Sequence, residues 1–361
     1  MIESDFASKP IQKKLNSGAF TWKAPSNIAL VKYWGKKQDQ IPENASLSFT
    51  LDACRTTTTL EFEKLEDPVS DFSFDVYFDG KLKEDFKPKI ETFFTRIENY
   101  LTCLKDYHFT IRTANTFPHS SGIASSASGM GALALCLMSM QKEMHPEMDQ
   151  EYFNKKASFL ARLGSGSASR SIEGDVIVWG KHDGILGSSD LFATKFPNKV
   201  HTNFKNYHDT ILLIDKGEKQ VSSTVGHGLM HGHPFAQERF KQATSNLSKL
   251  SEVLQNGDLK AFIKIVESEA LTLHAMMMSS TPYFILMRPN TLEVINRIWE
   301  FRQETGTHVC FTLDAGANVH VLYPEKEAEE VYEFIKSDLV AYCQNGHYIC
   351  DRVGLGAKQM Y

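Results

Sequence analysis

The stretch FPHSSGIASSASGMGALAL, residues 117–135, joins a loop rich in serine and glycine to a run of small apolar residues. We expect a helix over residues 125–144, with Ser125 and Ser126 in its first turn. The N-terminus of a helix has unpaired N–H groups and about half a positive charge, so it attracts anions. Gly122 would let the backbone approach a phosphate, and the Ser126 hydroxyl would reach a phosphate oxygen or its Mg²⁺. The stretch predicts either a phosphate site or a serine-capped helix.

Two common catalytic loops are absent from this stretch. It lacks the Gly-Lys-Ser/Thr end of a Walker A phosphate loop. It also lacks the G-x-S-x-G turn that presents the nucleophile of α/β-hydrolases. The second absence argues against a serine hydrolase.

Length, charge and hydropathy limit the class of protein. With 361 residues the chain is longer than one core usually supports, so we expect two domains. A net charge of −5 without a basic run argues against a nucleic-acid partner. No segment has the roughly 20 apolar residues of a membrane span, and residues 1–18 lack the apolar core of a secretory signal. We therefore expect a cytoplasmic protein, away from membranes, with a small-molecule substrate.

Helices and strands are predicted in irregular order, which favours an α+β fold over a doubly wound sheet. Apolar residues at helical spacing predict a helix over 88–104. Further helices are expected at 125–144, 149–162, 234–255, 258–277, 290–304 and 325–342. Residues 21–36 are expected to start as a strand and run into a loop. Further strands are expected at 55–65, 71–82, 107–114, 175–180, 206–215, 307–314, 318–324 and 347–354. We divide the chain into a polar extension (1–18), an N-terminal domain (19–205) and a C-terminal domain (206–361), because 197–208 is polar and irregular.

The six cysteines form no C-x-x-C pair, and several lie in apolar runs. A buried thiol behaves as a small hydrophobic group. This pattern favours reduced structural cysteines over a disulfide framework or a zinc site.

Three further stretches carry residues suited to an anionic substrate. APSNIALVKYWGKK (24–37) places Lys32, Tyr33 and Lys36 close together, as a polyanion site or as a strand with solvent-facing lysines. LGSGSASRSIEGD (163–175) combines Arg170 with serine hydroxyls in a glycine-rich segment, as an anion site or as a flexible surface turn. FTLDAGANVH (311–320) ends an apolar strand at Asp314, as a general base or as a turn-forming aspartate.

These stretches together resemble the diphosphomevalonate decarboxylases of the GHMP kinase superfamily. The resemblance implies a two-domain fold, with an N-terminal ribosomal-protein-S5-like domain for ATP and a C-terminal ferredoxin-like α/β sandwich. It also implies ATP-dependent decarboxylation of mevalonate 5-diphosphate to isopentenyl diphosphate, with Mg²⁺, in a homodimer. The matching stretches, in family order, are APSNIALVKYWGKK, PENASLSFTLD, SSGIASSASG, RLGSGSASRSIEG, VSSTVGH and FTLDAGANVH.

The resemblance also implies roles for individual residues. Asp314, Arg170 and Lys32 match catalytic positions: Asp314 acts on the 3-hydroxyl, Arg170 holds the substrate carboxylate and Lys32 lies near the catalytic centre. Substrate-side positions are matched by Asn27, Tyr33, Lys36, Ser165, Ser167 and Arg170. ATP-phosphate positions are matched by Ser121, Gly122, Ala124, Ser125 and Ser126, with Ser126 also near Mg²⁺.

The chain departs from the usual family pattern at three places. HSSGI (119–123) replaces a more apolar loop, and Glu173 and Asp175 add acidity near a phosphate site. In VSSTVGH, Thr224 stands where some members have arginine, and His227 where many have methionine. These departures leave open a mevalonate 3-kinase or a phosphomevalonate decarboxylase.

Two weaker signals and one other class of protein complete the prediction. His227, His231 and His233 have the ligand types of a metal site, but a polar loop or helix start fits their spacing better. The methionine-rich stretch 274–284 predicts core packing or a substrate-facing wall. A non-catalytic nucleotide- or isoprenoid-binding protein is the alternative of another class.

Overall fold

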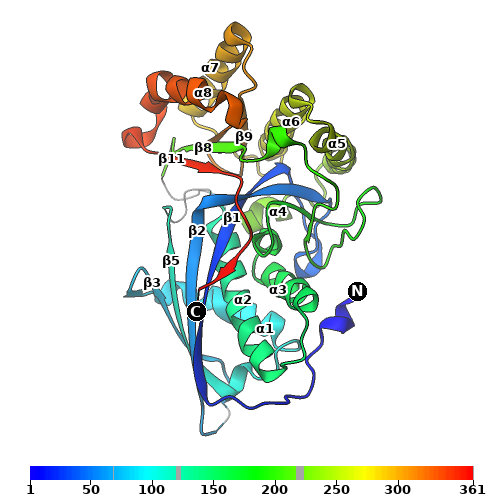
Figure 1. Ribbon diagram of the computed structural model, residues 1–361, viewed down its shortest axis with the longest axis vertical. Helices are drawn as coiled ribbons and strands as arrows, with labels where there is room; N and C mark the ends of the chain where they lie inside the picture. The colour runs from blue at the N-terminus through cyan, green and yellow to red at the C-terminus, as the bar shows by residue number, and fades with distance from the viewer. Residues whose placement is uncertain (68, 119–122, 217–222, 361) are drawn as a thin grey trace.

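The computed structural model describes residues 1–67, 69–118, 123–216 and 223–360. Within these ranges the chain forms two lobes, each built on one β-sheet (Figure 1). The larger sheet has eight strands and the smaller sheet has four. No regular strand–helix–strand repeat links them, so the predicted α+β class is confirmed.

The larger sheet runs in the order β12-β1-β2-β5-β3-β4, with β6 paired to β2 and β7 paired to β6. Its two longest strands, β1 and β2, are antiparallel, and the register of β1 shifts on either side of Asn27 to Ala29. Such irregularities break the strict alternation of side chains between the two faces of the sheet. They occur where β1 ends and the chain leads on to Lys32. The strands are β1 (Ser17–Val31), β2 (Ser46–Lys64), β3 (Ser73–Phe78), β4 (Lys81–Leu82), β5 (Tyr107–Asn115), β6 (Val176–Trp179), β7 (Thr194–Lys195) and β12 (Lys358–Gln359).

Three helices, α1 (Lys87–Ile97), α2 (Ser125–Met144) and α3 (Gln150–Gly164), pack against this sheet (Figure 1). Most residues of α2 are buried, because it lies between β1, β2 and α3. The predicted helix over 125–144 is therefore confirmed. The predicted helix over 88–104 is too long, since α1 ends at Ile97 and the last apolar residues reach the core from a turn and a short 3₁₀ segment.

Residues 1–18, predicted as a polar extension, are mostly exposed but are held to the domain at Phe6. Phe6 is completely buried, and its ring stacks on Phe159 of α3 with the ring centroids 4.5 Å apart. The hydroxyl of Tyr152 also donates a hydrogen bond to the carbonyl of Asp5 at 3.0 Å. One buried aromatic ring in a polar segment is enough to tie that segment to the domain.

The smaller sheet runs in the order β11-β8-β10-β9, all antiparallel. Helix α6 packs on both β9 and β1, so it bridges the two sheets, and α7 and α8 cover the far end of the small lobe (Figure 1). The predicted helix over 325–342 is interrupted, because α8 continues as a π-helical turn and then a 3₁₀ turn. The elements are β8 (His208–Leu212), α4 (Ser223–Gly228), α5 (Ala236–Asn256), α6 (Leu259–Met278), α7 (Pro289–Thr305), β9 (Cys310–Leu313), β10 (Val319–Tyr323), α8 (Ala328–Phe334) and β11 (Tyr348–Arg352).

The C-terminal segment returns to the larger sheet, where β12 pairs with β1 through Gln359 and Trp22 (Figure 1). On the way, Asp351 of β11 accepts backbone N–H bonds from Asp52, Ala53 and Cys54 of β2, at 2.8, 2.7 and 2.7 Å. The end of the predicted C-terminal domain (206–361) therefore belongs to the larger sheet and not to the small lobe.

The cysteines are buried singly, apart from one at the surface. Across the described ranges all six cysteines are free, and only Cys350 is exposed. Helices long and apolar enough to cross a membrane do not occur in the described part of the chain.

Candidate active site

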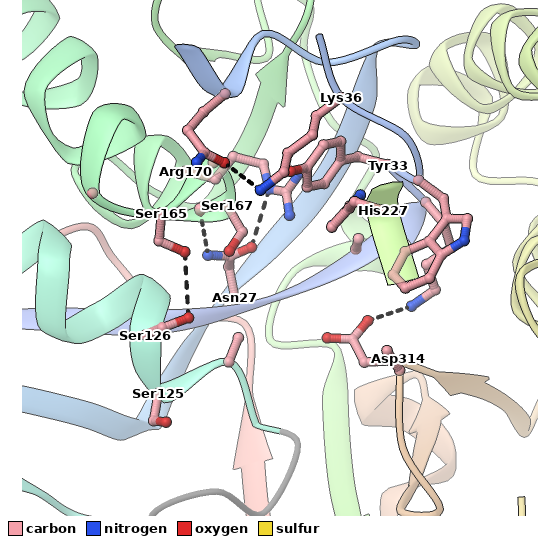
Figure 2. Close-up of a pocket in the computed structure, with 18 of the residues that line it drawn as sticks. Asn27, Tyr33, Lys36, Ser125, Ser126, Ser165, Ser167, Arg170, His227 and Asp314 are labelled. Atoms are coloured by element: carbon pink, nitrogen blue, oxygen red, sulfur yellow. Dashed lines mark hydrogen bonds and ion pairs between the residues drawn. The ribbon is translucent and has the colours of Figure 1, made fainter. Parts of the chain in front are cut away.

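A cleft of about 330 Å³ opens where the two sheets meet (Figure 2). Its walls come from the end of β1, the start of α2, the 3₁₀ segment Gly166–Ser171, helix α4 and the turn after β9. Stretches far apart in sequence therefore share one cavity. Eleven of the predicted site residues line it: Asn27, Lys32, Tyr33, Lys36, Ala124, Ser125, Ser126, Ser165, Ser167, Arg170 and Asp314. The predicted residues Ser121 and Gly122 lie outside the described residues.

An ion pair joins the two lobes at one end of the cleft. Lys32 Nζ lies 2.9 Å from Asp314 Oδ1, with the Lys32 side chain 2% exposed and the Asp314 side chain 27% exposed. Burial lowers the pKa of Lys32, and the Asp314 carboxylate acts in the opposite direction. His274 Nε2 donates to the backbone carbonyl of Asp314 at 3.1 Å, and burial lowers the pKa of His274 to about 4. A neutral histidine therefore holds the backbone beneath the Asp314 carboxyl group.

A buried charge network fixes the backbone of Lys32. Arg239 of α5 donates to both oxygens of Glu269 of α6, at 3.0 and 2.5 Å. Glu269 Oε2 in turn accepts the backbone N–H of Lys32 at 2.8 Å, and Arg239 Nη2 donates to the Lys32 carbonyl at 3.1 Å. Both side chains of the Arg239–Glu269 pair are completely buried. A buried pair with these extra bonds fixes geometry, and removing one partner would leave an unpaired buried charge.

Arg170 lies on the opposite wall within a different set of contacts. Its Nε donates to Asn27 Oδ1 at 3.1 Å and its Nη1 to Ser46 Oγ at 2.5 Å, while Asn27 Nδ2 donates to Ser171 Oγ at 2.9 Å. Burial lowers the pKa of Arg170 to about 10, and Asp314 acts against this shift. No carboxylate within the described ranges lies at ion-pair distance from its guanidinium. The alternative of a flexible surface turn is wrong, because Gly166–Ser171 is a buried 3₁₀ segment.

The first turn of α2 faces the cleft with its hydroxyls. The N-cap position is Ala124, whose φ of 45° is unusual for a residue with a side chain, and no side chain caps the helix in the described part. The alternative of a serine-capped helix is therefore not what forms. Ser126 Oγ lies 3.3 Å from Ser165 Oγ, so the helix start and the glycine-rich segment meet (Figure 2). Unpaired N–H groups and hydroxyls at this place suit an anion.

Lys36 and Tyr33 form the donor-rich end of the cleft. Lys36 Nζ donates to the neutral Gln40 Oε1 at 3.0 Å, and its pKa is lowered by burial and then by the charge of Arg96. Burial raises the pKa of the Tyr33 hydroxyl, with Arg170 acting in the opposite direction, so the phenol remains a donor. Gly166 allows this arrangement, because a Cβ there would meet the Tyr33 hydroxyl at 2.8 Å. The alternative of solvent-facing lysines is wrong for Lys32.

The histidine cluster does not form a metal site. His231 Nε2 donates to the carbonyl of Lys36, and His233 Nε2 donates to the carbonyl of Met276, both at 3.1 Å. His227 instead accepts from the backbone N–H of Gly35 at 3.0 Å. The described ranges contain no group of three potential metal ligands. Separate backbone partners explain the three histidines.

Some cleft residues lie outside the motifs or carry no signal of their own. Gln40 follows a polar loop, and Lys89 comes from α1, which reads as an ordinary amphipathic helix. The Glu269–Arg239 pair was also missed, because a charged residue on a long helix usually faces solvent. The one sequence signal for this buried pair is that Glu269 lies within the largely apolar stretch 259–278.

Both lobes of the chain match families of known proteins. Residues 24–192 match the family described as "Diphosphomevalonate decarboxylase-like N-terminal domain". Residues 210–353 match "Mevalonate 5-diphosphate decarboxylase C-terminal domain". The diphosphomevalonate decarboxylase of Ganoderma lucidum is 29% identical over 333 residues, covering 87% of this chain and 80% of that protein. The rat enzyme of the same name is 28% identical, covering 87% and 78%.

Solved structures give the same result. Mevalonate diphosphate decarboxylase from Enterococcus faecalis is 28% identical with a TM-score of 0.79, covering 95% of this chain and 99% of that chain. The Staphylococcus aureus enzyme is 27% identical with a TM-score of 0.80, covering 96% and 98%. A further structure, "MDDEF in complex with MVAPP, AMPPCP and Magnesium", is 29% identical with a TM-score of 0.80. This chain belongs to the diphosphomevalonate decarboxylase family, and its two lobes form the GHMP kinase fold.

Proposed function

We propose that the protein is an ATP-dependent carboxy-lyase that converts mevalonate 5-diphosphate to isopentenyl diphosphate, ADP, phosphate and CO₂. The observation that carries this proposal is the Lys32–Asp314 pair, which faces Arg170 across a cleft otherwise lined by hydrogen-bond donors. One ionised carboxylate among many donors suits a substrate with several negative charges and one hydroxyl. The family and the substrate complex of a relative support the same reaction.

Asp314 is proposed to act on the 3-hydroxyl of the substrate. Its contact with Lys32 keeps the carboxylate ionised, so it accepts a hydrogen bond or the proton as the hydroxyl oxygen attacks the terminal phosphate of ATP. In the next step the C3–O bond breaks and phosphate leaves, so positive charge develops at C3. Any proton that Asp314 has accepted passes to solvent first, so that the group is again a carboxylate and stabilises that charge. The carbon–carbon bond to the carboxylate then breaks, which forms the double bond and releases CO₂.

Arg170 is proposed to hold the substrate carboxylate until it leaves. Its guanidinium is buried, is oriented by Asn27 and Ser46, and has no acidic partner at ion-pair distance in the described chain. Arginine binds carboxylates with fixed geometry, so the bond to be broken would be aligned. Asn27 then serves as the support of Arg170 on the substrate side.

The start of α2 is proposed to bind the ATP phosphates through Ala124, Ser125 and Ser126, with Ser121 and Gly122 as further proposed contacts. Mg²⁺ prefers oxygen ligands, and the Ser126 hydroxyl together with phosphate oxygens fits that preference. When bound, the ion would neutralise phosphate charge during transfer. The 5-diphosphate is assigned to Tyr33, Lys36, Ser165 and Ser167, whose side chains line the adjoining wall.

A three-substrate assay tests the function. Purified protein is given ATP, Mg²⁺ and either mevalonate, its 5-phosphate or its 5-diphosphate, and both ADP and CO₂ are measured. The proposal expects equal amounts of the two products, with the 5-diphosphate giving the highest kcat/KM. ADP without CO₂ would indicate a 3-kinase, and preference for the 5-phosphate would indicate a phosphomevalonate decarboxylase. Calorimetric binding of ATP without turnover on any substrate would indicate a non-catalytic protein.

The family resemblance also supports a homodimer that works in the cytoplasm. The buried thiols suit a reducing compartment, because burial raises the pKa of Cys136 to about 12 and so keeps it unreactive. Light scattering coupled to size-exclusion chromatography tests the dimer, and cell fractionation tests the location.

A further inference from the structure

His227 lies in the cleft, held between two aromatic rings. It belongs to the short helix α4, and its ring centroid is 4.2 Å from that of Tyr33 and 4.4 Å from that of Trp34. Gly226 permits this packing, because a Cβ there would meet the Trp34 ring at 2.7 Å. Figure 2 shows the imidazole beside Tyr33 on the wall that also carries Lys36. The ring is therefore fixed, although only 7% of the residue is exposed.

The contacts of His227 decide which ring nitrogen carries the proton. The backbone N–H of Gly35 donates to Nδ1 at 3.0 Å, so Nδ1 is the acceptor. In a neutral imidazole the proton must then be on Nε2. Burial lowers the pKa of His227 to about 3, and the charges of Lys36 and Arg170 lower it further in the same direction. The ring is thus a neutral donor, and its Nε2 makes no hydrogen bond to any residue that the structure describes.

The neighbours of this donor indicate its ligand. Lys36, Arg170 and the Tyr33 hydroxyl are all donors, and both charges that act on His227 are positive. The acceptor of the Lys36 ammonium group, Gln40 Oε1, is neutral, so a group of donors with no carboxylate among them is complementary to an anion with several oxygens. A neutral imidazole adds a hydrogen-bond donor there without adding a third positive charge beside Lys36 and Arg170.

We propose that His227 binds the substrate directly, donating its Nε2–H to an oxygen of the 5-diphosphate and so helping to select the diphosphate over the monophosphate. The selection follows because a monophosphate has fewer oxygens to satisfy the donors on this wall, and an unsatisfied buried donor costs binding energy. This inference rests on the proposed function, and it assigns a role to one of the chain's departures from its family.

Two substitutions of equal length test the donor. His227→Gln and His227→Met both lose the acceptor for Gly35, but only glutamine carries an N–H group that reaches the position of Nε2. We expect His227→Met to have a KM for mevalonate 5-diphosphate about tenfold above that of His227→Gln, since a hydrogen bond to a charged group is worth about 1.5–3 kcal/mol. The KM for ATP should agree within about twofold between the variants. The ratio of kcat/KM for diphosphate over monophosphate should fall only in His227→Met.

Equal KM values for the two variants would overturn the proposal. If neither variant folds, His227→Asn provides the test, because asparagine keeps an acceptor for the Gly35 N–H group and removes the donor at the Nε2 position. A KM for mevalonate 5-diphosphate equal to that of the wild type would then overturn the proposal. His308→Asn, outside the cleft, is the control for a general effect of losing histidine. Calorimetric titration with mevalonate 5-diphosphate separates the two claims: without turnover the proposed function fails, while the affinities of the variants still test His227.

Discussion

The two ends of the cleft handle charge in opposite ways. At the end formed by Lys32 and Asp314, each cation has an acidic partner, and the supporting pair Arg239–Glu269 is likewise balanced. At the end formed by Lys36, Tyr33 and His227, the cleft-facing groups are donors, and Lys36 has only the neutral Gln40 as its partner. Under the proposed function this difference separates two tasks: the balanced charges would control one proton, and the donors without acidic partners would bind the anionic part of the substrate.

Removing the carboxylate from the balanced end gives the largest expected effect. Asp314→Asn keeps the size of the side chain and loses the negative charge, so kcat should fall about 10³-fold or more. The Kd for ATP should change by less than about threefold, since the start of α2 is untouched. Steady-state kinetics and calorimetry measure the two quantities. Asp338→Asn, on an exposed turn outside the cleft, is the control, and a near-normal rate for Asp314→Asn would contradict the role.

The second largest expected effect is that acid lowers the free energy of unfolding through His274, which supports the end of the cleft formed by Lys32 and Asp314. Its pKa is lowered from 6.5 to about 4 by burial, so the unfolded chain binds more protons between these values. Stability from this group is complete above about pH 6.5 and is lost as the pH falls towards 4. From pH 7 to pH 5 the free energy of unfolding should fall by about 2 kcal/mol more in wild type than in His274→Gln.

Urea unfolding at pH 7, 6 and 5 measures this difference. The glutamine variant keeps an N–H group for the Asp314 carbonyl but does not titrate. His231→Gln, which removes an exposed histidine from a different segment, should retain the wild-type pH dependence. Parallel curves for wild type and His274→Gln would show that His274 is not the titrating group.

The unbalanced end should respond mainly in binding. Lys36→Met removes one cation, so the KM for mevalonate 5-diphosphate should rise about tenfold while kcat changes little. Lys37→Met is a close control, because Lys37 is the next residue, is 57% exposed and does not line the cleft. A fall in kcat without a change in KM would place Lys36 at the chemical step and would break the contrast between the two ends.

Sequence reasoning found most charged groups of this cleft because each lies in a short segment with its own chemical signal. Lys32 and Asp314 directly follow strands, and Arg170 lies in a segment rich in glycine and serine. The long run of small apolar residues likewise predicted α2 as a buried helix.

What the sequence left undecided depends on tertiary contact. Glu269 and Arg239 lie on long helices, and no local pattern distinguishes a buried charge pair between helices from two solvated charges. Phe6 gave no signal, since one aromatic residue in a polar segment has no periodicity. His227 was noticed as a departure, but its tautomer depends on an N–H group 192 residues away in sequence.

The bond set at Asp351 has a mechanical consequence for the catalytic pair. Asp351 fastens β11, one edge of the small sheet, to β2 of the large sheet, whereas Asp314 follows β9 at the opposite edge. Three strand spacings separate these edges, so Asp314 lies roughly 14 Å across the small sheet from this attachment. A rotation of about 5° would carry Asp314 roughly 1 Å past Lys32, a misplacement that can cost about a hundredfold in rate. A tilt about this attachment would therefore displace Asp314, the residue proposed to act on the substrate hydroxyl, more than it would displace β11.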